Sequence, residues 1–187
     1  METTRSFIAL EISNPIQKEL ARLQQELQTA NADIKWVKPT RIHLTLKFLG
    51  DVSPQLLTEV KTVISGLGLE TPAFEIGIER LGAFPTSEHP RVIWVGIGQG
   101  KECSQRLAKN LEEKLQQLGF IPEKKPFQPH LTLGRVRSNH NRAQCTELLR
   151  NLSVAPIAMR ADKLVLFKST LTPDGAIYEP LHEVKLP

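Results

Sequence analysis

The chain has 187 residues, which is long enough to bury a core in one domain or in two small lobes. Apolar residues make up 40% and charged residues 24%, values typical of a globular protein, and there is no run of eighteen apolar residues that would predict a membrane span. A net charge of +4 is compatible with an anionic ligand but does not identify one. Cys103 and Cys145 stand alone and the first residues lack a secretory signal, so we expect no disulfides and a cytoplasmic location.

The first half of the sequence alternates strand and helix patterns. Asn14 followed by Pro15 favours the start of a helix, and Ile16, Leu20 and Leu23 then recur at helical spacing. The pattern predicts a strand over residues 7–12, a helix over 14–30, a short extended segment over 34–37, a strand over 43–49, a helix over 53–67, a strand over 74–78 and a loop over 82–90.

The second half repeats this order at an offset of about 87 residues. It predicts a strand over 92–97, a helix over 101–118, a strand from residue 130, a helix over 139–151 and strands over 163–167 and 176–184, the last one after the turn residues Pro173, Asp174 and Gly175. Two copies of one unit tend to pair about a pseudo-twofold axis. We therefore predict an α+β fold, formed by a single domain over residues 1–187, in which two pseudo-symmetric lobes of antiparallel sheet and helices surround a central cleft.

One short pattern opens the middle strand of each copy. Residues 38–46 are KPTRIHLTL and residues 125–133 are KPFQPHLTL. The period of two places each histidine and threonine on one face of a strand and the leucines on the other. The leucine face is expected to be buried, so two such strands that face each other would line a polar, imidazole-bearing cleft.

A pair of histidines suits acid and base catalysis on an anionic phosphoryl group. With an ordinary pKa of about 6.5, one imidazole can be neutral and accept a proton while the other is protonated and donates one. Threonine hydroxyls on the same face can donate hydrogen bonds to phosphate oxygens during an in-line displacement. The sequence contains no HExxH, CxxC, Walker or GxGxxG pattern, so we predict neither a metal nor another cofactor.

The paired motifs resemble the two-histidine (2H) phosphoesterase superfamily. The segments HLTLKFLG (43–50), PRVIWVG (90–96) and PHLTLGR (129–135) are similar to RNA 2',3'-cyclic phosphodiesterases, historically called 2'-5' RNA ligases. The resemblance extends from about residue 5 to about residue 181 and implies a bilobal fold with a central cleft. It also implies hydrolysis of a terminal 2',3'-cyclic phosphate of RNA to a 2'-phosphate.

The resemblance assigns roles to the motif residues. His43 would protonate the departing 3'-oxygen and His130 would activate water as the general base. Thr45 and Thr132 would hold phosphate oxygens, and Arg135 would clamp the phosphate.

Four other positions bear on this assignment. Strict alternation places Arg135 on the leucine face, so the strand must end or bulge at Gly134. Phe48 falls on the same strand face as the leucines and is expected in the core. Stacking on an RNA base is the alternative for Phe48 and also for Phe7. Arg41 is either an RNA contact or a solvated charge.

The predicted partner is RNA with a 2',3'-cyclic phosphate end, tRNA fragments among the possibilities, or a cyclic nucleotide. The duplication supplies both motifs within one chain, so we expect a monomer. The alternatives among enzymes are a 2'-5' RNA ligase and a phosphodiesterase for small cyclic nucleotides or oligoadenylates. The alternative from another class is a noncatalytic RNA-end-binding protein, for which arginine or lysine would serve as well as histidine.

Overall fold

Two antiparallel β-sheets form the framework of the protein, for which a computed structural model describes residues 2–173 and 175–187. The elements in chain order are β1 (Thr4–Leu10), α1 (Asn14–Gln28), β2 (Ile34–Trp36), the 3₁₀ turn η1 (Pro39–Arg41), β3 (Leu44–Val52), α2 (Pro54–Glu70), β4 (Phe74–Pro85), β5 (Pro90–Ile97), α3 (Lys101–Gln116), β6 (His130–Val136), α4 (Arg142–Asn151), β7 (Ala158–Ala161), β8 (Lys163–Thr172) and β9 (Gly175–Lys185). Within the described residues, one sheet has the strand order β3-β1-β8-β9 and the other β2-β6-β5-β4-β7.

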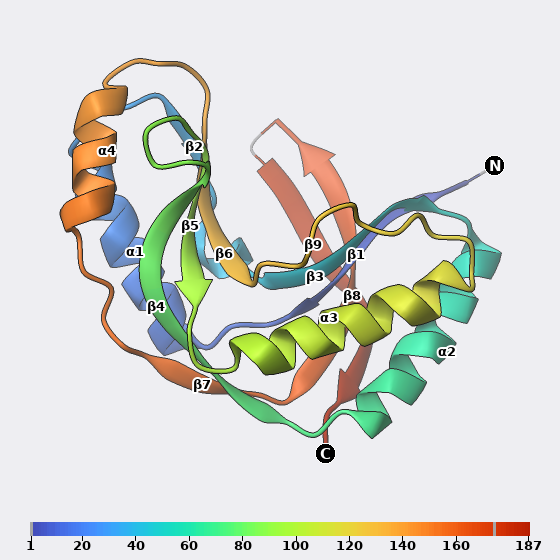
Figure 1. Ribbon diagram of the computed structural model, residues 1–187. Helices are drawn as coiled ribbons and strands as arrows, with labels where there is room; N and C mark the ends of the chain where they lie inside the picture. Colours follow the sequence, from blue (N-terminus) through green and yellow to red (C-terminus); the bar gives the residue numbers. More distant parts are fainter. Residues whose placement is uncertain (1, 174) are drawn as a thin grey trace.

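Each sheet and its helices form a lobe that draws on both halves of the chain. In the four-stranded lobe, β8 from the second half pairs with β1, and α3 packs against β3. In the five-stranded lobe, β4 from the first half pairs with β5, and α1 packs against α4. Figure 1 shows α1 and α4 beside the five-stranded sheet and α2 and α3 beside the other. The predicted α+β fold with two lobes is confirmed, with a reciprocal exchange of elements between the two halves.

The apolar core continues through both lobes and is supplemented by a smaller cluster. The main cluster includes the buried face of α1 and the leucines of both motifs, such as Leu44 and Leu131. The smaller cluster consists of Phe7, Ala9, Val165 and Phe167, with Tyr178 packed against it. Its residues alternate along β1 and β8 with residues of the main core. The smaller cluster therefore lies on the opposite face of the four-stranded sheet.

A β-bulge interrupts the first motif strand at Leu46. The register of β1 against β3 shifts between Ile8 and Ala9, which leaves Leu46 without a partner in β1. One extra residue reverses the alternation, so Lys47 and Phe48 change faces before a second register shift at Leu49. Phe48 is accordingly 63% exposed, and the prediction that it packs in the core is wrong.

The second motif strand bulges at the equivalent residue, Leu133, where the register of β5 against β6 shifts in the same way. The bulge lies one residue before the predicted position, Gly134. It brings Arg135 to the face of β6 that carries His130, and Arg135 is exposed there. The prediction that β6 abandons strict alternation before Arg135 is confirmed.

The first bulge also turns Lys47 into the interior, where it forms a buried ion pair. Its Nζ donates to Oε1 of Glu112 on α3 at 2.9 Å and to the carbonyl oxygen of Ile121 at 3.0 Å. The same carboxylate oxygen accepts a hydrogen bond of 2.7 Å from the backbone N–H of Glu123. These contacts tie β3 to the segment that leads into the second motif.

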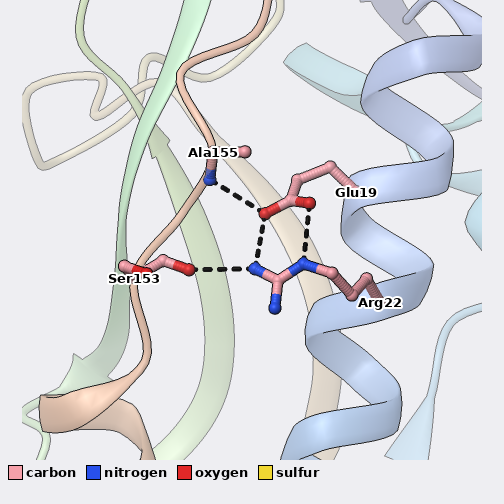
Figure 2. A network of polar contacts seen from close by, with 4 residues as sticks. All are labelled: Glu19, Arg22, Ser153 and Ala155. Atoms are coloured by element: carbon pink, nitrogen blue, oxygen red, sulfur yellow. Dashed lines mark hydrogen bonds and ion pairs between the residues drawn. The ribbon is translucent and has the colours of Figure 1, made fainter.

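A second polar network fastens α1 to the connection between α4 and β7 (Figure 2). The guanidinium of Arg22 donates to both carboxylate oxygens of Glu19, at 2.9 and 2.7 Å, and to the carbonyl oxygen of Ser153 at 2.9 Å. Glu19 also accepts a hydrogen bond of 2.9 Å from the backbone N–H of Ala155. The hydrogen bonds from Arg22, with that from Ala155, hold the pKa of Glu19 below its usual range despite burial.

One predicted segment differs from the structure, one short strand was not predicted, and one predicted turn is only partly described. The predicted loop over residues 82–90 is largely strand, because β4 continues to Pro85 and β5 begins at Pro90. Gly82 lies within β4, and a Cβ there would clash with the indole ring of Trp94, so the strand requires glycine at this position. The short strand β7 was not predicted, and Asp174 of the predicted turn lies outside the described residues. None of the described helices is long and apolar enough to cross a membrane.

We expect Glu112→Ala to destabilise the protein more than Lys47→Met does. The first change leaves an ammonium whose side chain is only 3% exposed without its nearest carboxylate, and breaking a buried pair in this way costs roughly 3–5 kcal/mol. The second change removes the charge and retains an apolar stem of similar length. Urea unfolding of both variants measures the difference, and a larger loss for Lys47→Met would contradict this account of the pair.

The Glu19 network makes stability depend on pH in a defined direction. Because the pKa of Glu19 is lower in the folded chain, the stability from its carboxylate is present at neutral pH and is lost as the pH falls through the folded pKa. We expect Glu19→Gln to be less stable than the wild type at about pH 7, with the gap narrowing toward about pH 3. Urea unfolding at several pH values tests this, with the exposed Glu59→Gln as the control. A gap that stays constant with pH would show that the carboxylate charge is not responsible.

Candidate active site

The two motif histidines lie at the start of neighbouring strands from different lobes. His43 directly precedes β3, and His130 is the first residue of β6. The two strands contact each other and meet near the centre of Figure 1. Both histidines are half-buried, as are Thr45 and Thr132 two residues further along.

Aromatic rings surround His43. The centroid of its imidazole lies 4.7 Å from that of Phe167, 5.4 Å from that of Tyr178 and 6.0 Å from that of Phe7. These rings belong to the smaller apolar cluster on the four-stranded sheet. Burial lowers the pKa of His43, while the negative charge of Glu11 acts in the opposite direction.

His130 has a comparable environment in the other lobe. Its ring lies 5.1 Å edge-on from that of Phe84 and 6.3 Å from that of Trp94. Nδ1 is 2.6 Å from the carbonyl oxygen of Gln128. A carbonyl can only accept, so Nδ1 carries the hydrogen and the lone pair of the neutral ring is on Nε2. Burial lowers the pKa of His130, the hydrogen bond to Gln128 opposes that effect, and the charge of Arg135 adds to it.

The internal repeat extends to these surroundings. Phe7 and Trp94, which contact the two histidines from adjacent strands, are separated by the same 87 positions as the histidines. Each imidazole also interacts with the backbone two residues before it, His43 with Arg41 and His130 with Gln128. The two halves thus hold their histidines in the same way.

A cavity of about 440 Å³ lies between the lobes and adjoins His43 through Phe7 and Tyr178. Its walls come from β1, β3, β8 and β9 on one side and from β2, η1 and β6 on the other. No carboxylate lines it among the described residues. Its charged lining residues are Arg5, Lys35, Lys38, Arg41 and Arg135.

Four of the residues predicted to bind substrate line this cavity. They are Phe7, Arg41, Phe48 and Arg135. Phe48 reaches the cavity only because of the bulge at Leu46. A larger, more open depression of about 840 Å³ beside α4 includes none of the predicted residues, so the smaller cavity is the candidate site.

The sequence reasoning missed other lining residues. Tyr178 lies on β9 and has no counterpart in the motifs. Lys35 and Trp36 reach the site because β2, a strand of the first half, pairs with β6 of the second. Lys38 could have been identified from the sequence, because it belongs to the repeated Lys-Pro pair. The pairing of β2 with β6 has no such indication in the sequence.

The sequence matches the model of the family described as LigT like phosphoesterase over residues 10–94 and 97–178. A curated relative from Methanothermobacter thermautotrophicus, named RNA 2',3'-cyclic phosphodiesterase, is 34% identical over 183 residues, 97% of this chain and 98% of the relative. Another of that name, from Aeropyrum pernix, is 35% identical over 167 residues, 89% of this chain and 94% of the relative.

Solved structures agree with these matches. The crystal structure of TT0787 of Thermus thermophilus is 25% identical, with a TM-score of 0.80 and 97% of both chains covered. The fold of E. coli LigT complexed with 3'-AMP is also similar, with a TM-score of 0.79, 23% identity and 99% of both chains covered. The predicted fold and the prediction of a phosphodiesterase enzyme are confirmed. The chain belongs to the LigT-like phosphoesterase family.

Proposed function

We propose that the protein hydrolyses the 2',3'-cyclic phosphate at an RNA end to a 2'-phosphate, with two histidines as acid and base and without a metal ion. The observation that carries this proposal is the pair of desolvated imidazoles, held alike at the start of touching strands, beside a cavity lined by cations. The names of the curated relatives support the same reaction.

The proposed reaction begins with water attacking phosphorus. His130 accepts the proton of this water at Nε2, which has the free lone pair because Nδ1 donates to Gln128. The bond between phosphorus and the 3'-oxygen breaks in line with the attack, and His43 donates a proton to that oxygen. Water and the cyclic diester thus give a 2'-phosphomonoester and a 3'-hydroxyl, with one proton taken up by His130 and one released by His43.

The lowered pKa values support a catalytic role for both rings. Burial favours the neutral imidazoles in the free enzyme, which suits the base. An anionic phosphate bound between His43 and His130 would raise both pKa values, and one ring would then take up the proton needed by the acid. Substrate binding would therefore set the protonation state that the reaction requires.

The remaining predicted residues have distinct proposed roles. Thr45 and Thr132 share the strand faces of the histidines and would donate hydrogen bonds to non-bridging oxygens. Arg135 lines the cavity on the face of β6 that carries His130 and would clamp a phosphate bound there. Phe48, being largely exposed in the cavity, would stack on a base.

Of the two remaining candidates, Phe7 receives another role and Arg41 keeps its proposed RNA contact. Phe7 is only 4% exposed, so we assign it to packing against His43 instead of stacking on a base. Arg41 lines the cavity at the end of η1 and would attract RNA phosphates.

We expect His43→Ala and His130→Ala each to fold and to lose about 10²–10⁴-fold in kcat, the usual contribution of a general acid or base. The substrate is an RNA oligomer with a 2',3'-cyclic phosphate end, in excess EDTA, and the readout is the position of the product phosphate. The exposed His140→Ala serves as the control. Full activity in both variants would overturn the mechanism, and loss of wild-type activity in EDTA would overturn its metal independence. Binding of RNA without turnover by the wild type would indicate an end-binding protein.

A substrate with sulfur in place of the 3'-bridging oxygen tests the assignment of acid and base. A thiolate leaves without protonation, so it removes the need for the acid but not for the base. We expect His43→Ala to recover most of its lost rate on this substrate and His130→Ala to recover little. Measured single-turnover rates with both substrates give the comparison, and recovery by His130→Ala instead would reverse the two roles.

A further inference from the structure

The cavity contains more positive charge than a cyclic phosphate requires. A 2',3'-cyclic phosphate is a monoanion, and Arg135 together with one protonated imidazole can match its charge. Four more cations line the same space: Arg5, Lys35, Lys38 and Arg41. None of the four forms an ion pair within 4.0 Å with any carboxylate in the described part of the chain.

The register of β2 against β6 places two of these positive charges opposite each other, which lowers stability when no anion is bound. Lys35 pairs directly with Arg135 in the antiparallel ladder, so the two side chains share one face of the sheet. Like charges directly opposite in a sheet are destabilising. An anion between or beside these side chains would remove that cost.

The cations are interleaved with aromatic and apolar surfaces. Phe48 and Tyr178 line the cavity from β3 and β9. Leu171 is 68% exposed at the same cavity. A groove that alternates cations with stacking surfaces suits a single nucleic acid strand, because the cations follow the backbone and the rings accept the bases.

We propose that Arg5, Lys35, Lys38 and Arg41, here called the cationic arm, bind the internucleotide phosphates that precede the cyclic end. The preferred substrate is then an oligonucleotide strand and not a mononucleoside cyclic phosphate. This inference rests on the proposed function and adds to it the part of the strand, beyond the reacting nucleotide, that the enzyme recognises.

Two substrates with the same reacting nucleotide test the cationic arm. They are adenosine 2',3'-cyclic phosphate and an RNA tetranucleotide that ends in the same group. We expect the wild type to have a kcat/KM at least about tenfold higher for the tetranucleotide at low salt, and this advantage to fall as salt is added.

Arm variants separate this site from the reacting centre. Lys35→Gln and Arg5→Gln should each lose roughly 3- to 10-fold in kcat/KM on the tetranucleotide, mainly through KM, and change less than about twofold on the mononucleotide. The plot of log kcat/KM against log salt has a negative slope, and each variant should make this slope shallower by about 0.7. Lys18→Gln, which removes an exposed charge on α1 outside the cavity, should change neither substrate.

The possible results distinguish a failure of the cationic arm from a failure of the proposed function. Equal efficiency on both substrates in the wild type, or equal losses on both in the arm variants, would overturn the cationic arm and leave the proposed function intact. Hydrolysis of neither substrate would overturn the proposed function. In that case, fluorescence anisotropy of a labelled tetranucleotide tests the arm alone: weaker binding by Lys35→Gln supports it, and unchanged binding overturns it.

Discussion

One β-bulge that the two motif strands share is the constraint on which the site depends. A bulge at the third residue after each histidine leaves the histidine and threonine on one face and exchanges the faces of the residues that follow. The same device has different consequences in the two copies. In β3 it buries Lys47 and exposes Phe48, whereas in β6 it turns Gly134 inward and Arg135 outward.

The residue that follows each bulge, Lys47 or Gly134, points inward and supports the opposite side of the site. Lys47 holds the segment before the second motif through Glu112 and the carbonyl of Ile121. At Gly134, a Cβ would lie 2.7 Å from the side chain of Ile34 and 3.0 Å from the ring of Trp36, so glycine permits β2 to lie close against β6. That close approach brings the cations of β2 to the cavity. Each motif therefore organises residues from the other half of the chain.

The site combines two arrangements that are unfavourable in the free protein. Aromatic rings desolvate both imidazoles, and cations that pair with no carboxylate of the described residues gather beside them. Such departures from the usual rules of packing and charge are expected at functional sites, where a ligand compensates for them. In this protein one ligand class, an anionic strand end, would relieve both, because its charge stabilises a protonated imidazole and neutralises the cations. The rest of the fold supplies stability through a core that continues across the two lobes.

The sequence by itself determined the elements, the repeat and the residues of the two motifs. Period-two alternation identified the motif strands, and the offset of 87 positions predicted two similar lobes, because these patterns are local and are repeated within the chain. The family resemblance added the reaction class. Strict alternation places Arg135 on the leucine face. It was expected on the histidine face only because the family resemblance assigns it a phosphate contact, which requires the strand to end or bulge first.

Only the tertiary structure decided which elements share a lobe and where the bulges lie. Leu46 and Leu133 look like their leucine neighbours, and a bulge exists only relative to a partner strand. Phe48 was therefore expected in the core although it lines the cavity. The pairing of β2 with β6, which brings Lys35 opposite Arg135, likewise has no local signal. Strand pairing across distant segments depends on packing of the whole chain, and the details of the cavity follow from that packing.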